Sequence, residues 1–173
     1  ADWFGALGAG ETAGQFTVKL PQGWQTVETS VQFPACGGKT LSVYDFCKQV
    51  DAQTVLIVTN RPAIANSWYS DYVRFLGRES GYLFVSHVDA LAGQPHVLDE
   101  QGYLDAAAQG EKLYKRIEFV SLQDMKGSKY FGGEYDKLRH LTELNWDVLV
   151  IDEAHEGVDT YKTDLAFDRI RCK

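Results

Sequence analysis

Residues 146 to 155 read Trp-Asp-Val-Leu-Val-Ile-Asp-Glu-Ala-His, an apolar run that ends in two adjacent acids. The branched apolar residues from Val148 to Ile151 are typical of a strand buried on both faces, as in a parallel sheet. Ligands of open parallel sheets gather at the carboxyl ends of the strands, where Asp152 and Glu153 fall. Neighbouring carboxylates repel unless a cation compensates, so the pair indicates a metal site. Capping of a following helix is the simpler explanation of the same acids.

A second motif lies upstream and has the order of a phosphate-binding loop. Residues 31 to 40 read Val-Gln-Phe-Pro-Ala-Cys-Gly-Gly-Lys-Thr, and helical spacing follows them. Glycines let backbone N–H groups approach phosphates, and the start of a helix adds positive potential. Lys39 would reach the β- and γ-phosphates of a nucleotide, and the Thr40 hydroxyl would coordinate Mg²⁺. The full G-x-x-x-x-G-K-[ST] spacing requires a glycine where this chain has Phe33.

Length and composition favour one folded domain. The chain has 173 residues, of which 45% are hydrophobic and 13% aromatic, which suits one α/β domain rather than two. The net charge of −7 excludes a uniformly basic nucleic-acid-binding chain, so such contacts would be local. Cys36, Cys47 and Cys172 lack C-x-x-C spacing, which argues against zinc and against a disulfide framework. We expect no membrane span, no signal peptide and a cytoplasmic location.

Strands and helices alternate along the chain, which predicts an α/β fold with a mainly parallel sheet and helices on both faces. The predicted strands are 29–33, 54–60, 82–86, 117–121 and the run that ends at Asp152. The predicted helices are 39–50, 63–76, 135–143 and 160–171, and residues 89–110 should form a loop with a short helix. Residues 1–28 show no clear period and are expected to be a leader of uncertain structure. The end of the chain has no helix stop signal, which predicts a truncated domain over 29–173.

The two motifs together carry a family resemblance. Residues 152 to 155, Asp-Glu-Ala-His, resemble the DEAH box of superfamily-two helicases and translocases. Residues 55–68 resemble motif Ia of these enzymes, and residues 119–124 lie where they carry the segment before the DEAH strand. The stretch from about 29 to 171 looks like the first RecA-like domain of a DEAD/DEAH-box helicase, a P-loop NTPase fold. It is most similar to the helicase-like (Res) subunit of type III restriction enzymes.

The resemblance implies ATP and Mg²⁺ as cofactors and assigns the site residues. The phosphates would be bound by Gly37, Gly38, Lys39 and Thr40. Thr40 and Asp152 would hold Mg²⁺, while Glu153 would orient or deprotonate the attacking water. His155 would couple the nucleotide site to a second RecA-like domain, or it is a helix-start histidine with no special task.

The resemblance also implies a nucleic-acid track. Asn60, Arg61 and Pro62 would contact the sugar-phosphate backbone, with Gln123 and Lys126 as weaker candidates. An ordinary surface cation is the equal alternative for Arg61. The remaining histidines, His87, His96 and His140, lack ligand spacing and are expected to be structural or solvated.

The pattern departs from the family in two places. Neither Gln22 nor Gln25 has the context of an adenine-recognition glutamine, and motif III and a second RecA-like domain with its arginine finger would lie beyond the chain. We therefore expect the chain alone to bind nucleotide weakly and hydrolyse it poorly.

The leading hypothesis is the N-terminal ATP-binding domain of an ATP-dependent DNA helicase or translocase, restriction-enzyme-like. Its partners would be nucleic acid, DNA rather than RNA, the second RecA-like domain, and nuclease or methyltransferase domains or subunits, with no membrane partner. A degenerate nucleotide-binding or scaffold domain without hydrolysis is the alternative, motivated by Phe33 and Cys36. A small-molecule kinase is a third reading, for which residues 89–110 would have to supply the acceptor site.

Overall fold

The computed structural model describes residues 14–20, 23–29, 38–59, 62–110, 114–152 and 167–172, with the backbone alone for 14–20, 23–29, 38, 39 and 62. The strands are β1 (Gly14–Leu20), β2 (Gly23–Thr29), β3 (Thr54–Thr59), β4 (Tyr82–Ser86), β5 (Val97–Leu98), β6 (Lys115–Ser121), β7 (Asn145–Trp146), β8 (Val148–Asp152) and β9 (Arg171–Cys172). The helices are α1 (Gly38–Gln49), α2 (Ala65–Asp71), α3 (Glu100–Gln109), α4 (Leu122–Gly127) and α5 (His140–Glu143). A π-helical turn, η2 (Tyr72–Leu76), continues α2, and 3-10 turns form η1 (Pro62–Ile64), η3 (Arg78–Ser80), η4 (Asp89–Leu91) and η5 (Lys129–Phe131).

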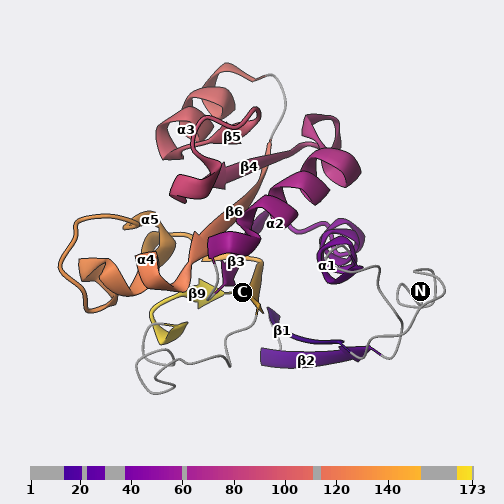
Figure 1. Ribbon diagram of the computed structural model, residues 1–173, viewed down its shortest axis with the longest axis horizontal. Helices are drawn as coiled ribbons and strands as arrows, with labels where there is room; N and C mark the ends of the chain where they lie inside the picture. Colours follow the sequence, from indigo (N-terminus) through magenta and orange to yellow (C-terminus); the bar gives the residue numbers. More distant parts are fainter. Residues whose placement is uncertain are drawn as a thin grey trace.

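The larger sheet has the strand order β2-β1-β8-β3-β6-β4-β5 (Figure 1). Strands β8, β3, β6, β4 and β5 run parallel, whereas β1 is antiparallel to both β2 and β8. Parallel strands need crossover connections, and helices of these connections pack on both faces of the sheet. The predicted α/β fold with a mainly parallel sheet is confirmed.

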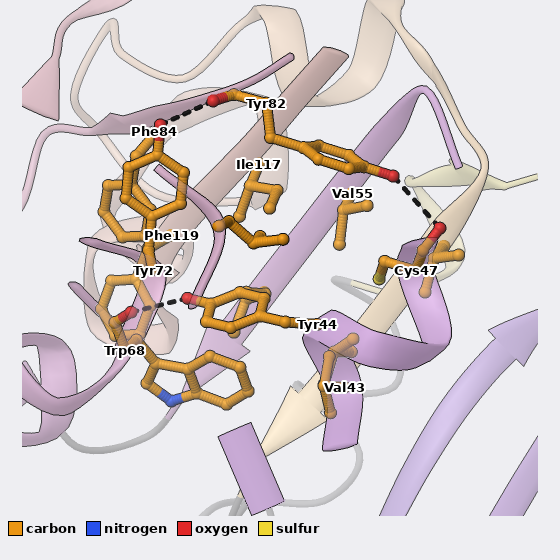
Figure 2. Packing of buried hydrophobic residues seen from close by; sticks show 14 of the residues in the cluster. Val43, Tyr44, Cys47, Val55, Trp68, Tyr72, Tyr82, Phe84, Ile117 and Phe119 are labelled. Carbon is orange, nitrogen blue, oxygen red and sulfur yellow. Dashed lines mark hydrogen bonds between the residues drawn. The ribbon is translucent and has the colours of Figure 1, made fainter. Parts of the chain in front are cut away.

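Helix α1 and the α2–η2 helix cover one face of the sheet through an aromatic core (Figure 2). The Tyr44 ring of α1 meets the Trp68 ring of α2 edge to face at 5.6 Å, and the Tyr44 hydroxyl donates to the Trp68 carbonyl at 2.6 Å. Tyr72 lies 5.2 Å from Phe84 of β4, centroid to centroid, and its hydroxyl donates to the Tyr82 carbonyl at 2.6 Å. These buried tyrosines therefore add apolar contact while each hydroxyl keeps an acceptor.

The opposite face is formed by the alternate residues of the same strands. Leu56 and Val58 of β3 and Leu149 of β8 pack there with residues of α4, α5 and the segment from Phe167 to Cys172. Trp146 is fully buried in this cluster, and its indole N–H donates to the carbonyl of Leu141 at 3.1 Å. Burial on both faces explains why the strands read as continuous apolar runs.

Most of the predicted elements in the parallel part are confirmed. The strands predicted at 54–60, 82–86 and 117–121 are β3, β4 and β6. The helix predicted over 39–50 is α1, and the helix predicted over 63–76 is the continuous run from η1 through α2 to η2. The loop over 89–110 contains α3, a longer helix than expected. Of the strand predicted over 29–33, Thr29 ends β2 instead of opening a new strand, and residues 30–37 lie outside the described chain.

The predicted helix over 135–143 is wrong before His140. The carbonyl of Gly127 accepts the N–H groups of Glu134 and Tyr135 at 3.0 and 2.9 Å, which folds this segment back on the end of α4. Leu138 then has a left-handed φ of 61°, a conformation that interrupts a right-handed helix. Helix α4 was not predicted.

The two ends of the chain also differ from the prediction. Residues 1–28 were expected to be a leader of uncertain structure, yet 14–20 and 23–29 form the β1–β2 hairpin that extends the sheet. Of the helix predicted over 160–171, Phe167 and Asp168 are helical, but Arg171 and Cys172 form β9, which pairs with β7. Residues 160–166 lie outside the described chain.

The Tyr82 side chain connects the amino end of β4 to the carboxyl-terminal end of α1 by hydrogen bonding. Its hydroxyl is close to the carbonyl oxygens of Ala52 (2.6 Å) and Cys47 (3.1 Å), inside the core. Replacing Tyr82 by phenylalanine should lower the free energy of unfolding by about 1–2 kcal/mol, since buried carbonyls lose their donor. Urea unfolding would measure this. Tyr130→Phe, which removes an exposed hydroxyl bonded to Asp136, is the matched control and should change stability by less than about 0.5 kcal/mol. Equal effects of the two variants would contradict the prediction.

Candidate functional site

The carboxyl edge of the parallel sheet carries the first part of the candidate site. Strand β8 is buried from Val148 to Val150 and becomes partly exposed at Ile151 and Asp152, where it ends. Asp152 lies opposite Thr59, the last residue of β3. Thr59 in turn lies opposite Ser121, the last residue of β6. Three neighbouring strands thus end in polar side chains at one edge, where ligands of such sheets bind.

Helix α1 carries the second part. Its last turn lies near the amino end of β4, because the Tyr82 hydroxyl contacts the Cys47 carbonyl. The first turn, with Gly38, Lys39 and Thr40, therefore points toward the carboxyl edge. The amide groups of a helix start favour anions, and the Thr40 side chain is 5% exposed. The structure thus brings Thr40 and Asp152 to the same edge of the sheet.

Several predicted site residues lie outside the described chain: Gly37, Asn60, Arg61, Glu153 and His155. The backbone of Gly38 and Lys39 belongs to α1, and Pro62 opens η1 directly after the gap that follows β3. Of the weaker candidates in α4, Gln123 is exposed and Lys126 is partly buried. The roles given to all of these residues stay predictions.

A cluster of ionisable residues that the sequence did not reveal lies on the face of the sheet that α4 and α5 cover. We name it the Arg116 cluster; its members are His87, Glu100, Arg116, Glu118 and His140. Arg116 and Glu118 of β6 are 2% and 0% exposed, and the Arg116 guanidinium donates to Glu118 at 2.7 Å. The Arg116 guanidinium also forms a two-pronged ion pair with Glu100 of α3.

His140 completes this network from α5. Its Nε2 lies 2.8 Å from both carboxylate oxygens of Glu118. Burial alone raises the pKa of Glu118, but the hydrogen bond with His140 and the charge of Arg116 outweigh it, so the pKa of Glu118 is lowered overall. The fold also brings His87 close to His140, and the centroids of the two rings lie 6.0 Å apart.

One signal could have pointed to the cluster. Arg116 and Glu118 alternate with the apolar residues Ile117 and Phe119 of β6, and a charge on a buried strand needs a partner. The partners come from α3 and α5, however, and their identity is a tertiary feature that no local spacing contains.

Among the described residues, no helix is long and apolar enough to cross a membrane.

Comparison with known proteins agrees with this architecture. Residues 25–170 match the family described as type III restriction enzyme, res subunit. Over 141 residues the chain is 26% identical to a Mycoplasma pneumoniae (strain ATCC 29342 / M129 / Subtype 1) protein provisionally named as the C-terminal part of a type II restriction enzyme and methyltransferase, RM.MpnORF110P. That alignment covers 79% of this chain and 18% of the relative, so the chain spans less than a fifth of that protein's length.

No solved structure is significantly similar to the chain. The family match covers most of the sequence and includes both the Gly-Gly-Lys-Thr and the Asp-Glu-Ala-His motifs. The chain therefore belongs to the family of the type III restriction enzyme res subunit and is a helicase-like ATP-binding domain of the restriction-enzyme type.

Proposed function

We propose that this chain is the ATP-binding domain of an ATP-dependent DNA helicase or translocase, which couples hydrolysis of Mg-ATP to movement along nucleic acid. The observation that carries the proposal is the common edge of the sheet where β8 ends in Asp152 and toward which α1 begins. A phosphate-binding helix start and a carboxylate at one sheet edge are the two halves of a Mg-nucleotide site. Family membership supports the same nucleotide.

The residues at this edge fit the chemistry of the cofactor. Thr40 and Asp152 offer a hydroxyl and a carboxylate oxygen, the ligands that Mg²⁺ prefers. Lys39, with the backbone N–H groups of Gly37 and Gly38, would bind the phosphates. When bound, Mg²⁺ neutralises the charge that builds up on the transferred phosphoryl group.

Glu153 directly follows Asp152, and we assign to it the positioning or deprotonation of the attacking water. His155 would couple the nucleotide site to the second RecA-like domain. Asn60, Arg61 and Pro62 follow Thr59, which lies opposite Asp152 at the same edge. We assign these three residues to the sugar-phosphate backbone of the nucleic acid, which requires no reading of bases.

The proposed partners follow from the same assignment. They are DNA, a second RecA-like domain that would supply the arginine finger, and a nuclease or methyltransferase domain or subunit. The name of the Mycoplasma relative joins restriction and methyltransferase functions in that protein, which supports such a partner here. The alternative is a scaffold domain that no longer hydrolyses nucleotide, which the Phe33 and Cys36 positions of the phosphate loop favour.

Nucleotide affinity separates the two functions. In the protein with its second RecA-like domain, Lys39→Ala should raise the Kd for Mg-ATP roughly 10- to 100-fold, because a charge-assisted hydrogen bond contributes about 1.5–3 kcal/mol. Titration calorimetry would measure the Kd. Lys48→Ala changes an exposed lysine in the last turn of the same helix and should leave the Kd unchanged. No measurable binding of Mg-ATP by the unmodified protein would favour the scaffold function.

A further inference from the structure

The Arg116 cluster lies apart from the candidate nucleotide site. Glu118 is opposite Leu56 of β3, which is opposite Leu149 of β8. Glu118 therefore sits well inside the sheet and two strands away from β8, whereas Asp152 is at the end of β8. The cluster is reached through a different opening, a cavity of about 390 Å³ whose lining includes His87, Glu100 and His140. Neither Thr40 nor Asp152, the side chains of the candidate nucleotide site that the structure describes, lines this cavity.

We propose that His87, Glu118 and His140 form a binding site for a divalent transition-metal ion of the Zn²⁺ type. Each of the three side chains offers one ligand atom, and these atoms lie within 4.8 Å of one another. Two imidazoles and one carboxylate form a set that Zn²⁺ and related ions bind, whereas Mg²⁺ prefers oxygen ligands alone. The site thus differs from the nucleotide site in ligand chemistry as well as in position.

The charges in the cluster favour a cation. Glu100 and Glu118 carry two negative charges, and Arg116 carries one positive charge. The cluster therefore has one negative charge in excess when His87 and His140 are neutral. A buried excess charge is costly unless it is compensated. A divalent ion would compensate it.

The geometry leaves Glu118 able to bind an ion while it keeps its partner. The Arg116 guanidinium donates to Oε1 at 2.7 Å, while His140 Nε2 lies 2.8 Å from Oε1 and from Oε2. The Oε1 bond would hold the carboxylate in place, as outer partners of metal ligands commonly do. Ligands at about 2.0–2.1 Å in tetrahedral geometry are roughly 3.3–3.4 Å apart, so His140 and Oε2 need to separate by about half an ångström.

His87 and the cavity supply the rest of the coordination shell. His87 follows β4 and is exposed, so its ring can turn toward Glu118 without disturbing the core. The adjoining cavity, into which Asp124 and Lys137 also face, has room for a water molecule as the fourth ligand. Three protein ligands and one water are the usual composition of an open zinc site.

The test is a metal titration of the full chain in the presence of excess Mg²⁺, which occupies oxygen-only sites. Cys36 and Cys172 are replaced by serine in all samples, because thiolates also bind Zn²⁺. Co²⁺ should give the visible absorption of a four-coordinate ion with one equivalent bound, and Zn²⁺ should displace it. His87→Asn should weaken Zn²⁺ binding by about tenfold or more, since even loss of an outer-shell partner commonly costs 10- to 100-fold.

His96→Asn is the matched control. His96 is an exposed histidine on a loop outside the cluster, with a φ of 69° that asparagine tolerates. Its replacement should leave Zn²⁺ affinity unchanged. The proposal is overturned if His87→Asn binds Zn²⁺ as tightly as the parent protein. It is equally overturned if Co²⁺ produces no four-coordinate spectrum, which would leave the His140–Glu118 contact as a hydrogen bond without a metal.

Discussion

Glu153→Gln should lower nucleic-acid-stimulated ATP hydrolysis by about 100-fold or more, since a positioned general base contributes roughly 10²–10⁴ to the rate. The glutamine keeps the size of the side chain but cannot accept the proton of the attacking water. Binding of Mg-ATP should remain close to that of the unmodified protein, because the phosphate and Mg²⁺ ligands assigned here are other residues. Steady-state phosphate release with and without DNA, in the protein that includes the second RecA-like domain, measures the effect.

The matched control is Glu143→Gln, which neutralises an exposed acid of α5 that pairs with Arg139 on the surface. This change should leave hydrolysis unaffected. Full turnover by Glu153→Gln would remove the role given to Glu153, and transfer of phosphate to a hydroxyl acceptor instead of water would favour a kinase. Loss of nucleotide binding in Glu153→Gln would show that the residue holds the cofactor and does not act on water.

The parallel part of the fold could be predicted because its signals are local. Strands β3 and β8 are runs of branched apolar residues, and the Gly-Gly-Lys-Thr motif marks the start of α1. Burial on both faces requires such runs, so each strand is recognisable without its neighbours. The placement of Asp152 at the edge of the sheet follows directly from the end of its run. The family resemblance, which rests on these same residues, is confirmed by the match over residues 25–170.

The β1–β2 hairpin also had a signal, which the interpretation of 1–28 as a leader missed. Phe16, Val18 and Leu20 alternate with polar residues, and the residue types Pro21-Gln22-Gly23 that follow are a turn signal in the sequence. Period-two alternation that ends in such a turn is typical of a hairpin. The glycines around it obscured the pattern. The helix predicted over 135–143 failed for the opposite reason, since hydrogen bonds of Glu134 and Tyr135 to the preceding Gly127 override its helical spacing.

The Arg116 cluster lay beyond sequence reasoning because its members come from four separate elements. His87 follows β4, Glu100 opens α3, Arg116 and Glu118 lie in β6, and His140 opens α5. Spacing along the chain cannot show that two histidines so far apart lie near one carboxylate. Only the packing of α3 and α5 beside β6 brings them together. Because its members are far apart in the sequence, the Arg116 cluster links separate elements of the fold. We therefore expect that removing one of its charges lowers the free energy of unfolding by a large amount.

Arg116→Met should lower the free energy of unfolding by about 3–5 kcal/mol, the usual cost of removing one partner from a buried ion pair. Methionine is an unbranched apolar side chain that can pack beside the rings of Tyr103 and Trp146, which lie 4.7 and 5.8 Å from the guanidinium carbon of Arg116. The decrease in the free energy of unfolding therefore reflects the lost charge, because Glu118 stays buried without the Arg116 cation. Urea unfolding of the full chain at neutral pH, with EDTA present to remove divalent metal, gives the value.

Neutralising the orphaned acid separates this explanation from a general loss of packing. The double variant Arg116→Met with Glu118→Leu should recover most of the lost stability, because an apolar pair of similar size often replaces a buried ion pair at little cost. Arg139→Met is the control on the surface: Arg139 and Glu143 are 69% and 56% exposed, and such pairs contribute under about 1 kcal/mol. If the double variant is as unstable as Arg116→Met alone, the uncompensated charge of Glu118 is not the cause. The aromatic packing around Arg116 would then account for the loss.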